Sequence, residues 1–123
     1  MITNFEDITH ELNAEEIHLA ELLIKSFKAR SKVNPVTAKE IVEGVNRTYN
    51  LKTKFNDSRL RKIVNYYRTH SIIPLLSCKY GYYVSYDQDE IRSNITSLTQ
   101  RATSILDCVY GLERLIKNES KNV

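Results

Sequence analysis

The chain has 123 residues and a formal net charge of +3, from 18 lysines and arginines against 15 aspartates and glutamates. This length favours one domain with a modest core, and 41% hydrophobic with 27% charged residues is typical of a globular protein rather than a disordered one. Runs of about 18 apolar residues, a signal peptide and a disulfide framework are all absent from the sequence. We therefore expect a cytoplasmic protein with free thiols and no membrane span.

The first half of the sequence predicts an arm and two capped helices. Residues 1–12 show only acidity, which predicts a loose N-terminal arm. Asn13 with Glu16, and Thr37 with Glu40, have the spacing of a capping box at a helix start. The apolar face of the first helix comprises Ile17, Ala20, Leu23, Ile24 and Phe27, widened by Leu19 and Leu22, and that of the second comprises Ala38, Ile41, Val42 and Val45.

A third helix and a β-hairpin follow. The second helix is expected to end near Tyr49, and a link from about Asn50 to Phe55 leads to a new start, where Asn56 or Asp57 can act as N-cap. Two short apolar segments, 72–76 and 82–84, then flank a tight connection in which Gly81 is expected to need a positive φ. The buried face of the third helix is predicted from i, i+3, i+4, i+7 spacing as Leu60, Ile63, Val64 and Tyr67.

The pattern in Ser58–Arg68, Ile73–Leu76 and Gly81–Val84 resembles the winged-helix branch of the helix-turn-helix family, and within it the small proteins of phages and prophages. The resemblance covers roughly residues 14 to 86. It implies a mainly α (α+β) fold: a winged helix-turn-helix with a two-stranded hairpin wing. Winged helices bind DNA, RNA or protein, so the resemblance does not fix the partner.

Positive charge is concentrated on the third helix and the hairpin. Residues 51–86 hold seven lysines and arginines against Asp57 alone, a local balance of +6, whereas 1–30 hold three against six and 87–123 hold five against six. The helical rotation of about 100° per residue places Ser58, Lys62, Asn65 and Thr69 outward when the apolar face is buried. A basic face kept only for solubility is the alternative interpretation, and the charge distribution favours nucleic-acid binding. The expected contact residues are Ser58, Arg59, Arg61, Lys62, Asn65, Tyr66, Arg68, Thr69, Lys79 and Tyr80.

Side chains of the hairpin have separate expected roles. Lys79 and Tyr80 lie at its tip, where they would touch phosphates or the minor groove, or have no partner at all. Tyr82 and Tyr83 point to opposite faces of their strand, so one is expected in the core and the other covering the sheet. Pro74 indicates an edge position for the first strand.

The last part of the sequence predicts one long helix, from Asp87 or Asp89 to about Lys117. Its apolar residues recur with alternating spacings of 4 and 3, the a/d pattern of a coiled-coil seam, and such a seam favours self-association as a homodimer. Packing back onto the first helix of the same domain is the alternative. The seam consists of Ile91, Ile95, Leu98, Ala102, Ile105, Val109, Leu112 and Ile116.

Nothing in the sequence indicates an enzyme, a cofactor or a metal site. The three histidines form no metal-binding helix motif, and a site from Asp7, His10 and Glu11 would lie on a terminal arm without a rigid shell. Neither Cys78 nor Cys108 lies in an activated-thiol motif.

The sequence therefore predicts a non-enzymatic protein that binds duplex DNA as a dimer, as a transcription regulator or a replication accessory factor. The alternative is a winged-helix protein-interaction module that does not bind nucleic acid. The expected layout is an arm (1–12), a winged helix-turn-helix domain (13–86), a long helix for oligomerisation (87–118) and a disordered tail (119–123).

Overall fold

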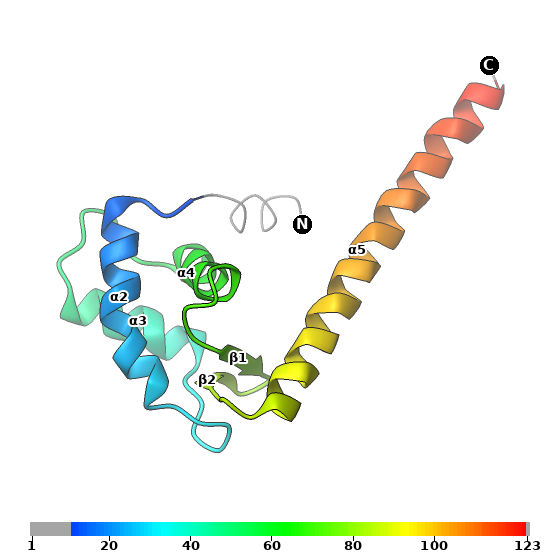
Figure 1. Ribbon diagram of the computed structural model, residues 1–123. Coiled ribbons are helices and arrows are strands. Elements are labelled where there is room, and N and C mark those ends of the chain that lie inside the picture. The colour runs from blue at the N-terminus through cyan, green and yellow to red at the C-terminus, as the bar shows by residue number, and fades with distance from the viewer. Residues whose placement is uncertain (1–10, 123) are drawn as a thin grey trace. The chain divides into compact units, whose positions relative to one another are not determined.

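The computed structural model describes residues 11–122, with side chains as far as Asn118 (Figure 1). The expected N-terminal arm lies almost wholly outside these residues. The chain divides into two compact units between Tyr86 and Asp87, and each is described by itself. The first unit contains helices α2 (Ala14–Lys28), α3 (Ala38–Thr48) and α4 (Asp57–Thr69) and strands β1 (Leu75–Cys78) and β2 (Gly81–Val84), and the second contains helix α5 (Gln88–Asn122). The fold is mainly helical with one small antiparallel sheet, in agreement with the α+β expectation.

The predicted helix starts of the first unit are confirmed. Asn13 and Glu16 form a complete capping box at α2, as Thr37 and Glu40 do at α3. Asn56 is the N-cap of α4, where its side chain accepts a hydrogen bond from the third helical amide. Each cap satisfies backbone N–H groups that have no partner within their own helix.

The predicted buried face of α2 is partly wrong. Ile17 and Leu22 are 38% and 41% exposed, whereas Leu19 is buried and Glu16 is only 1% exposed. Glu16 turns inward because two cations of α4 bind its carboxylate. Apolar periodicity cannot count an acid as an interior residue, so the predicted face was rotated away from Glu16.

The core of the first unit lies between the three helices and the hairpin. Tyr67 of α4 is at its centre: the ring is fully buried, and the hydroxyl donates a hydrogen bond to the Ala20 carbonyl of α2. Phe27 meets the Tyr67 ring edge to face, with ring centroids 5.8 Å apart. The buried cluster comprises Leu19, Ala20, Leu23, Phe27, Val36, Ile41, Val45, Phe55, Leu60, Ile63, Val64, Tyr67, Ile73, Leu75 and Val84.

The link between α3 and α4 is fixed by one side chain. The amide group of Asn46 in α3 accepts a hydrogen bond from the Phe55 N–H and donates one to the Phe55 carbonyl, both at 2.9 Å. These two bonds pair the link much as a neighbouring strand would, and the Phe55 side chain is fully buried beside them. A link longer than the tightest helix-turn-helix turns is therefore still rigidly placed.

Helix α4 ends in a Schellman motif. The Ile72 N–H donates to the Tyr67 carbonyl at 2.9 Å, the Ser71 N–H donates to the Arg68 carbonyl at 3.3 Å, and Ser71 has φ = 53°. This pattern of bonds normally has glycine at the left-handed position. Serine there carries a steric cost that glycine would not.

The hairpin lies slightly further along the chain than expected. β1 begins after Pro74 rather than at Ile72, and Cys78 pairs with Gly81 across a two-residue turn, Lys79–Tyr80. The positive φ of Gly81 is confirmed at 138°, and a Cβ there would lie only 2.3 Å from the Val36 carbonyl oxygen.

That close approach belongs to a third strand segment. Val36, between α2 and α3, pairs with Tyr82 through an isolated antiparallel bridge with hydrogen bonds of 2.7 and 2.9 Å. Tyr83 is buried and Tyr82 is half-buried against Phe27, which agrees with the expectation of one tyrosine inside and one covering the sheet.

Helix α5 has 35 residues, so it is about 52 Å long. Asp87 caps it, with one carboxylate oxygen accepting from the N–H groups of Asp89 and Glu90 at 2.9 and 3.0 Å, which confirms the predicted start. The helix continues to Asn122 instead of ending near Lys117, so it includes most of the expected tail. None of the helices within residues 11–122 combines the length and the hydropathy that crossing a membrane requires.

Candidate nucleic-acid interface

The inward face of α4 decides which of its side chains can reach a partner. The four predicted core residues of this helix are all buried: Leu60, Ile63, Val64 and Tyr67. The inward face of α4 is therefore the one that the sequence predicts. The positions of its cations differ from the prediction, because α2 packs on α4 with two acids.

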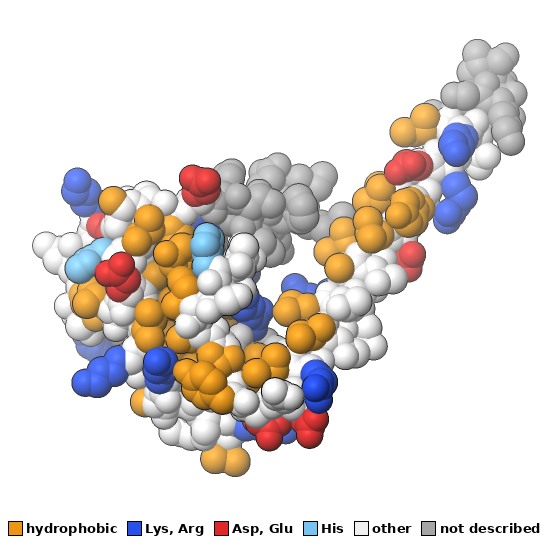
Figure 2. Space-filling view, viewed as in Figure 1, with side chains coloured by type: hydrophobic (Ala, Val, Ile, Leu, Met, Phe, Trp, Pro, Cys, Tyr) orange, Lys and Arg blue, Asp and Glu red, His pale blue; other side chains and the backbone are white. Residues whose placement is uncertain are grey.

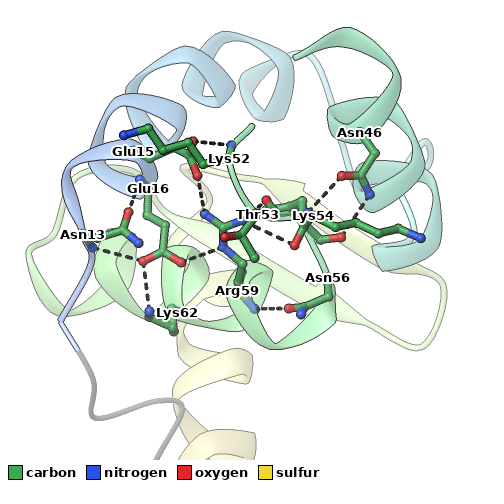
Figure 3. Close-up of polar contacts among 11 residues, drawn as sticks. Asn13, Glu15, Glu16, Asn46, Lys52, Thr53, Lys54, Asn56, Arg59 and Lys62 are labelled. Atoms are coloured by element: carbon green, nitrogen blue, oxygen red, sulfur yellow. Dashed lines mark hydrogen bonds and ion pairs between the residues drawn. The ribbon is translucent and has the colours of Figure 1, made fainter. Parts of the chain in front are cut away.

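Arg59 is buried, and its guanidinium group binds carboxylate and carbonyl oxygens of the same chain (Figure 3). Its Nε lies 2.9 Å from Glu16 Oε2, one Nη lies 2.8 Å from Glu15 Oε1, and the other Nη donates to the Thr53 carbonyl. Figure 3 shows the guanidinium pointing toward these groups from α2 and from the link. The prediction that Arg59 flanks the outward face of α4 is therefore wrong. The Arg59 side chain instead joins α2, α4 and the link.

Lys62 is also turned toward α2. Its Nζ lies 2.9 Å from Glu16 Oε1, and the side chain is only 16% exposed. The sequence predicts an outward position for Lys62, and this orientation is wrong because Glu16 attracts the ammonium group across the helix interface. Glu16 thereby accepts hydrogen bonds from Lys62, from Arg59 and from the Asn13 N–H.

These contacts change the protonation behaviour of the acids. Burial by itself would raise the pKa of Glu16, but the hydrogen bonds from Lys62, Arg59 and the Asn13 N–H outweigh it and hold that pKa below 4.5, its usual value. The Lys52 N–H, followed by Arg59, lowers the pKa of Glu15. Burial would lower the pKa of Arg59, but its bonds to Glu15 and Glu16 leave that pKa raised. The cluster is therefore fully charged at neutral pH.

The other two arginines of α4 make local contacts. Arg61 pairs with Asp57 one turn earlier and keeps 31% of its side chain exposed. Arg68 reaches the hairpin, where its Nε donates to the Leu75 carbonyl at 2.9 Å and one Nη lies 3.4 Å from Ser77 Oγ. Arg68 thus ties the end of α4 to β1, and a contact with a partner would be additional to that role.

The uncharged members of the expected set differ in exposure. Thr69 is exposed, whereas Ser58, Asn65 and Tyr66 are half-buried. The Tyr66 ring packs against the His70 ring at a centroid distance of 4.7 Å. Ser58, Asn65 and Tyr66 therefore lie between the inward face and solvent, and Thr69 is open to solvent.

The hairpin tip contributes two exposed residues to the expected set. Lys79 and Tyr80 are both exposed, Tyr80 to 65%, and the Lys79 ammonium lies 5.0 Å from the centre of the Tyr80 ring. A cation beside an open aromatic face can contact a phosphate and a sugar or base together. Their location at the tip matches the sequence expectation.

Two further cations were missed as individual candidates. Lys52 and Lys54, in the link before α4, are exposed. Both lysines are included in the charge balance of residues 51–86. Helical periodicity could not identify them as contact residues, because they lie in a link and not on a helix. Glu15 and Glu16 lie against this region, and including both lowers its balance from +6 to +4.

The described residues contain no group of three or more histidine, cysteine or acidic side chains that could hold a metal ion. Asp7 and His10, two of the three residues considered for a metal site on the N-terminal arm, lie outside the described residues. Cys78 is half-buried and Cys108 is exposed, and both are free thiols, as expected.

The predicted seam residues of α5 lie on a surface open to solvent, and Figure 2 shows hydrophobic side chains along this helix. The exposed fractions are 55% for Ile95, 39% for Leu98, 44% for Ile105, 41% for Val109, 61% for Leu112 and 66% for Ile116. Ala102 is also exposed and Ile91 is half-buried. Leu106, Tyr110 and Leu115 add further exposed apolar area.

Comparisons with protein families, with curated proteins and with solved structures find no match to this chain.

Proposed function

We propose that this chain is a winged helix-turn-helix protein that binds duplex DNA without catalysing a reaction, and that it does so as a dimer. The observation that carries the proposal is the unit formed by α4 and the hairpin, which we name the reading unit (residues 57–84). Arg68 holds the basic helix to β1, while Lys79 and Tyr80 stand exposed at the hairpin tip. A helix that enters a groove and a wing that touches the backbone beside it need this rigid connection.

The order of the elements supports the winged-helix assignment. A helix, a bridging strand segment at Val36, two further helices and an antiparallel hairpin follow one another along the chain. The Val36–Tyr82 bridge joins the segment before α3 to the edge of the two-stranded hairpin sheet. The link between α3 and α4, fixed by Asn46, corresponds to the turn of the helix-turn-helix.

The accessible cations support DNA as the partner. Lys52, Lys54 and Lys79 are exposed, and Arg61 is partly so. Neutralising phosphates with lysine and arginine supplies most of the affinity of non-specific DNA binding. The expected contact surface therefore centres on the link, the N-terminal half of α4 and the hairpin tip, and it excludes Arg59 and Lys62 in their present positions.

The exposed seam of α5 supports the dimer. Long isolated helices need packing for their stability, and a row of open isoleucine, leucine and valine side chains invites a second helix. Two linked reading units would bind more tightly than one through a raised effective concentration.

A protein-interaction module is the second candidate. It is favoured by the use of Arg59 and Lys62 to bind Glu16, which leaves the middle of α4 less basic than its sequence suggests. Titration of the purified chain with a fluorescent duplex of mixed sequence separates the two. Saturable binding at low salt supports the DNA proposal, and its absence leaves the protein partner.

A further inference from the structure

We propose that α5 pairs with α5 of a second copy as an antiparallel, two-fold symmetric coiled coil centred between Thr103 and Ser104. The proposal rests on the self-association proposed above and is independent of DNA binding. It specifies which helix packs on the exposed seam, in which orientation that helix runs and which residues are in contact.

The seam is symmetric about its own midpoint. Antiparallel coiled coils place an a residue of one helix opposite a d residue of the other. With the axis between Thr103 and Ser104, every seam residue finds such a partner and none is left over. Four kinds of layer result, each occurring twice by symmetry: Ile91 with Ile116 of the second copy, Ile95 with its Leu112, Leu98 with its Val109, and Ala102 with its Ile105.

Side-chain size favours this direction. A parallel, in-register pair would place Ala102 against Ala102 and leave a void in the middle of the coil, because protein interiors are close-packed. The antiparallel register instead sets Ala102 against Ile105, which is 44% exposed in the single chain. Every layer then contains at least one leucine or isoleucine side chain.

Charge favours the same direction. Antiparallel pairing brings Arg92 of one helix beside Glu113 of the other, at both ends of the coil. Arg92 is 69% exposed, and its two contacts, with Asp89 Oδ1 at 3.4 Å and with Gln88 Oε1 at 3.3 Å, are both long, so it can turn to a new partner. The parallel arrangement would instead pair Asn94 with Thr99, Arg101 with Leu106 and Cys108 with Glu113, and none of these is an oppositely charged pair.

The arrangement separates the two reading units. The seam from Ile91 to Ile116 spans about 38 Å of helix. In an antiparallel pair the two α5 starts, at Gln88, would lie about 46 Å apart along the coil. Each reading unit is thus attached to an opposite end of the dimer.

Spin-label distances test the direction in the full-length chain without DNA. Cys78 and Cys108 are replaced by serine, and one cysteine is introduced at Asp89, Ser104 or Lys117, all exposed positions outside the seam. The antiparallel coil predicts label separations of about 45 Å for Asp89→Cys and about 40 Å for Lys117→Cys, but under about 20 Å for Ser104→Cys. Three short distances would mean a parallel coil, and the absence of any distance would mean a monomer. Either result overturns the proposal.

Charge reversal provides an independent test with unlabelled protein. Arg92→Glu or Glu113→Arg alone puts like charges together in the antiparallel dimer, so the dimer dissociation constant measured by sedimentation should rise about tenfold. The double variant Arg92→Glu/Glu113→Arg restores both pairs and should return close to the wild-type value. Effects that simply add up would overturn the proposal, since in a parallel coil these positions are about 30 Å apart.

The two proposals fail in different ways. A chain that stays monomeric but shifts labelled duplex DNA would overturn the coiled coil and leave DNA binding intact. A chain that shows the predicted label distances but does not bind DNA would support the coiled coil and overturn the DNA-binding proposal.

Discussion

Arg59 Nε of α4 lies 2.9 Å from Glu16 Oε2 of α2, and both side chains are buried. This contact joins residues 43 positions apart and continues to Glu15 and to Lys62. Two of the four cations in the helix that the sequence marks as basic therefore hold the domain together. Breaking a buried pair by removing one partner leaves an uncompensated charge, which is strongly destabilising.

The first prediction concerns Glu16. Glu16→Gln removes the charge that Arg59 and Lys62 share, so we expect the free energy of unfolding to fall by about 3 kcal/mol. Urea denaturation at pH 7 measures it. Glu21→Gln, an exposed change in the same helix, is the control and should cost under about 0.5 kcal/mol. Equal values for the two variants would show that the Glu16 contacts do not stabilise the fold.

The second prediction concerns pH. The pKa values of Glu15, Glu16 and Glu40 are all lowered in the folded protein, so the unfolded chain binds protons more readily in acid. Their contribution is complete above about pH 5 and is lost as the pH falls through the folded pKa values. We expect urea midpoints to be level from pH 7 to about pH 5 and to fall below it, with a smaller fall for Glu16→Gln. An identical acid dependence in the variant would contradict this.

The third prediction concerns the end of α4. Ser71 occupies the left-handed position of a Schellman motif, so Ser71→Gly should relieve strain and raise the free energy of unfolding by about 0.5 kcal/mol. The same substitution at Ser26, an exposed position inside α2, should lower it by a similar amount. Thermal or urea unfolding of both variants checks the pair, and a loss of stability at both positions would refute the assignment of Ser71.

The fourth prediction concerns the proposed DNA contacts. Lys54→Ala/Lys79→Ala removes two exposed cations that have no acidic partner in the described structure, so folding should be unaffected. Affinity for duplex DNA should fall, and the slope of log affinity against log salt should become shallower by about 2, one unit for each lost phosphate contact. Lys25→Ala, on α2, is the charge-matched control for one lysine. A slope unchanged in the double variant would remove the link and the wing from the interface.

Local signals explain which parts of the fold could be predicted. The capping boxes at Asn13 and Thr37 and the caps at Asn56 and Asp87 involve residues within one turn, so the sequence alone identifies them. The repeat of apolar residues along α5 likewise involves one segment only, so it can also be identified from the sequence.

The failures involve partners that lie far away along the chain. Glu16 was predicted only as a capping residue because the cations that bind it belong to α4, and Lys62 was expected outward because the acid that binds it belongs to α2. Gly81 was assigned its positive φ correctly, but the carbonyl of Val36 that crowds it comes from a strand segment that no local pattern marks. The winged-helix assignment and the DNA contacts stay predictions.

Fluorescence anisotropy of the full-length chain with a mixed-sequence duplex, titrated from about 50 to 200 mM salt, measures whether the chain binds DNA through phosphate contacts. We expect saturable binding at the lower salt that weakens steeply as salt rises, with a slope set by the exposed cations of the link, α4 and the hairpin tip. Failure to bind at 50 mM would contradict this expectation, and the reading unit would then have to serve a protein partner.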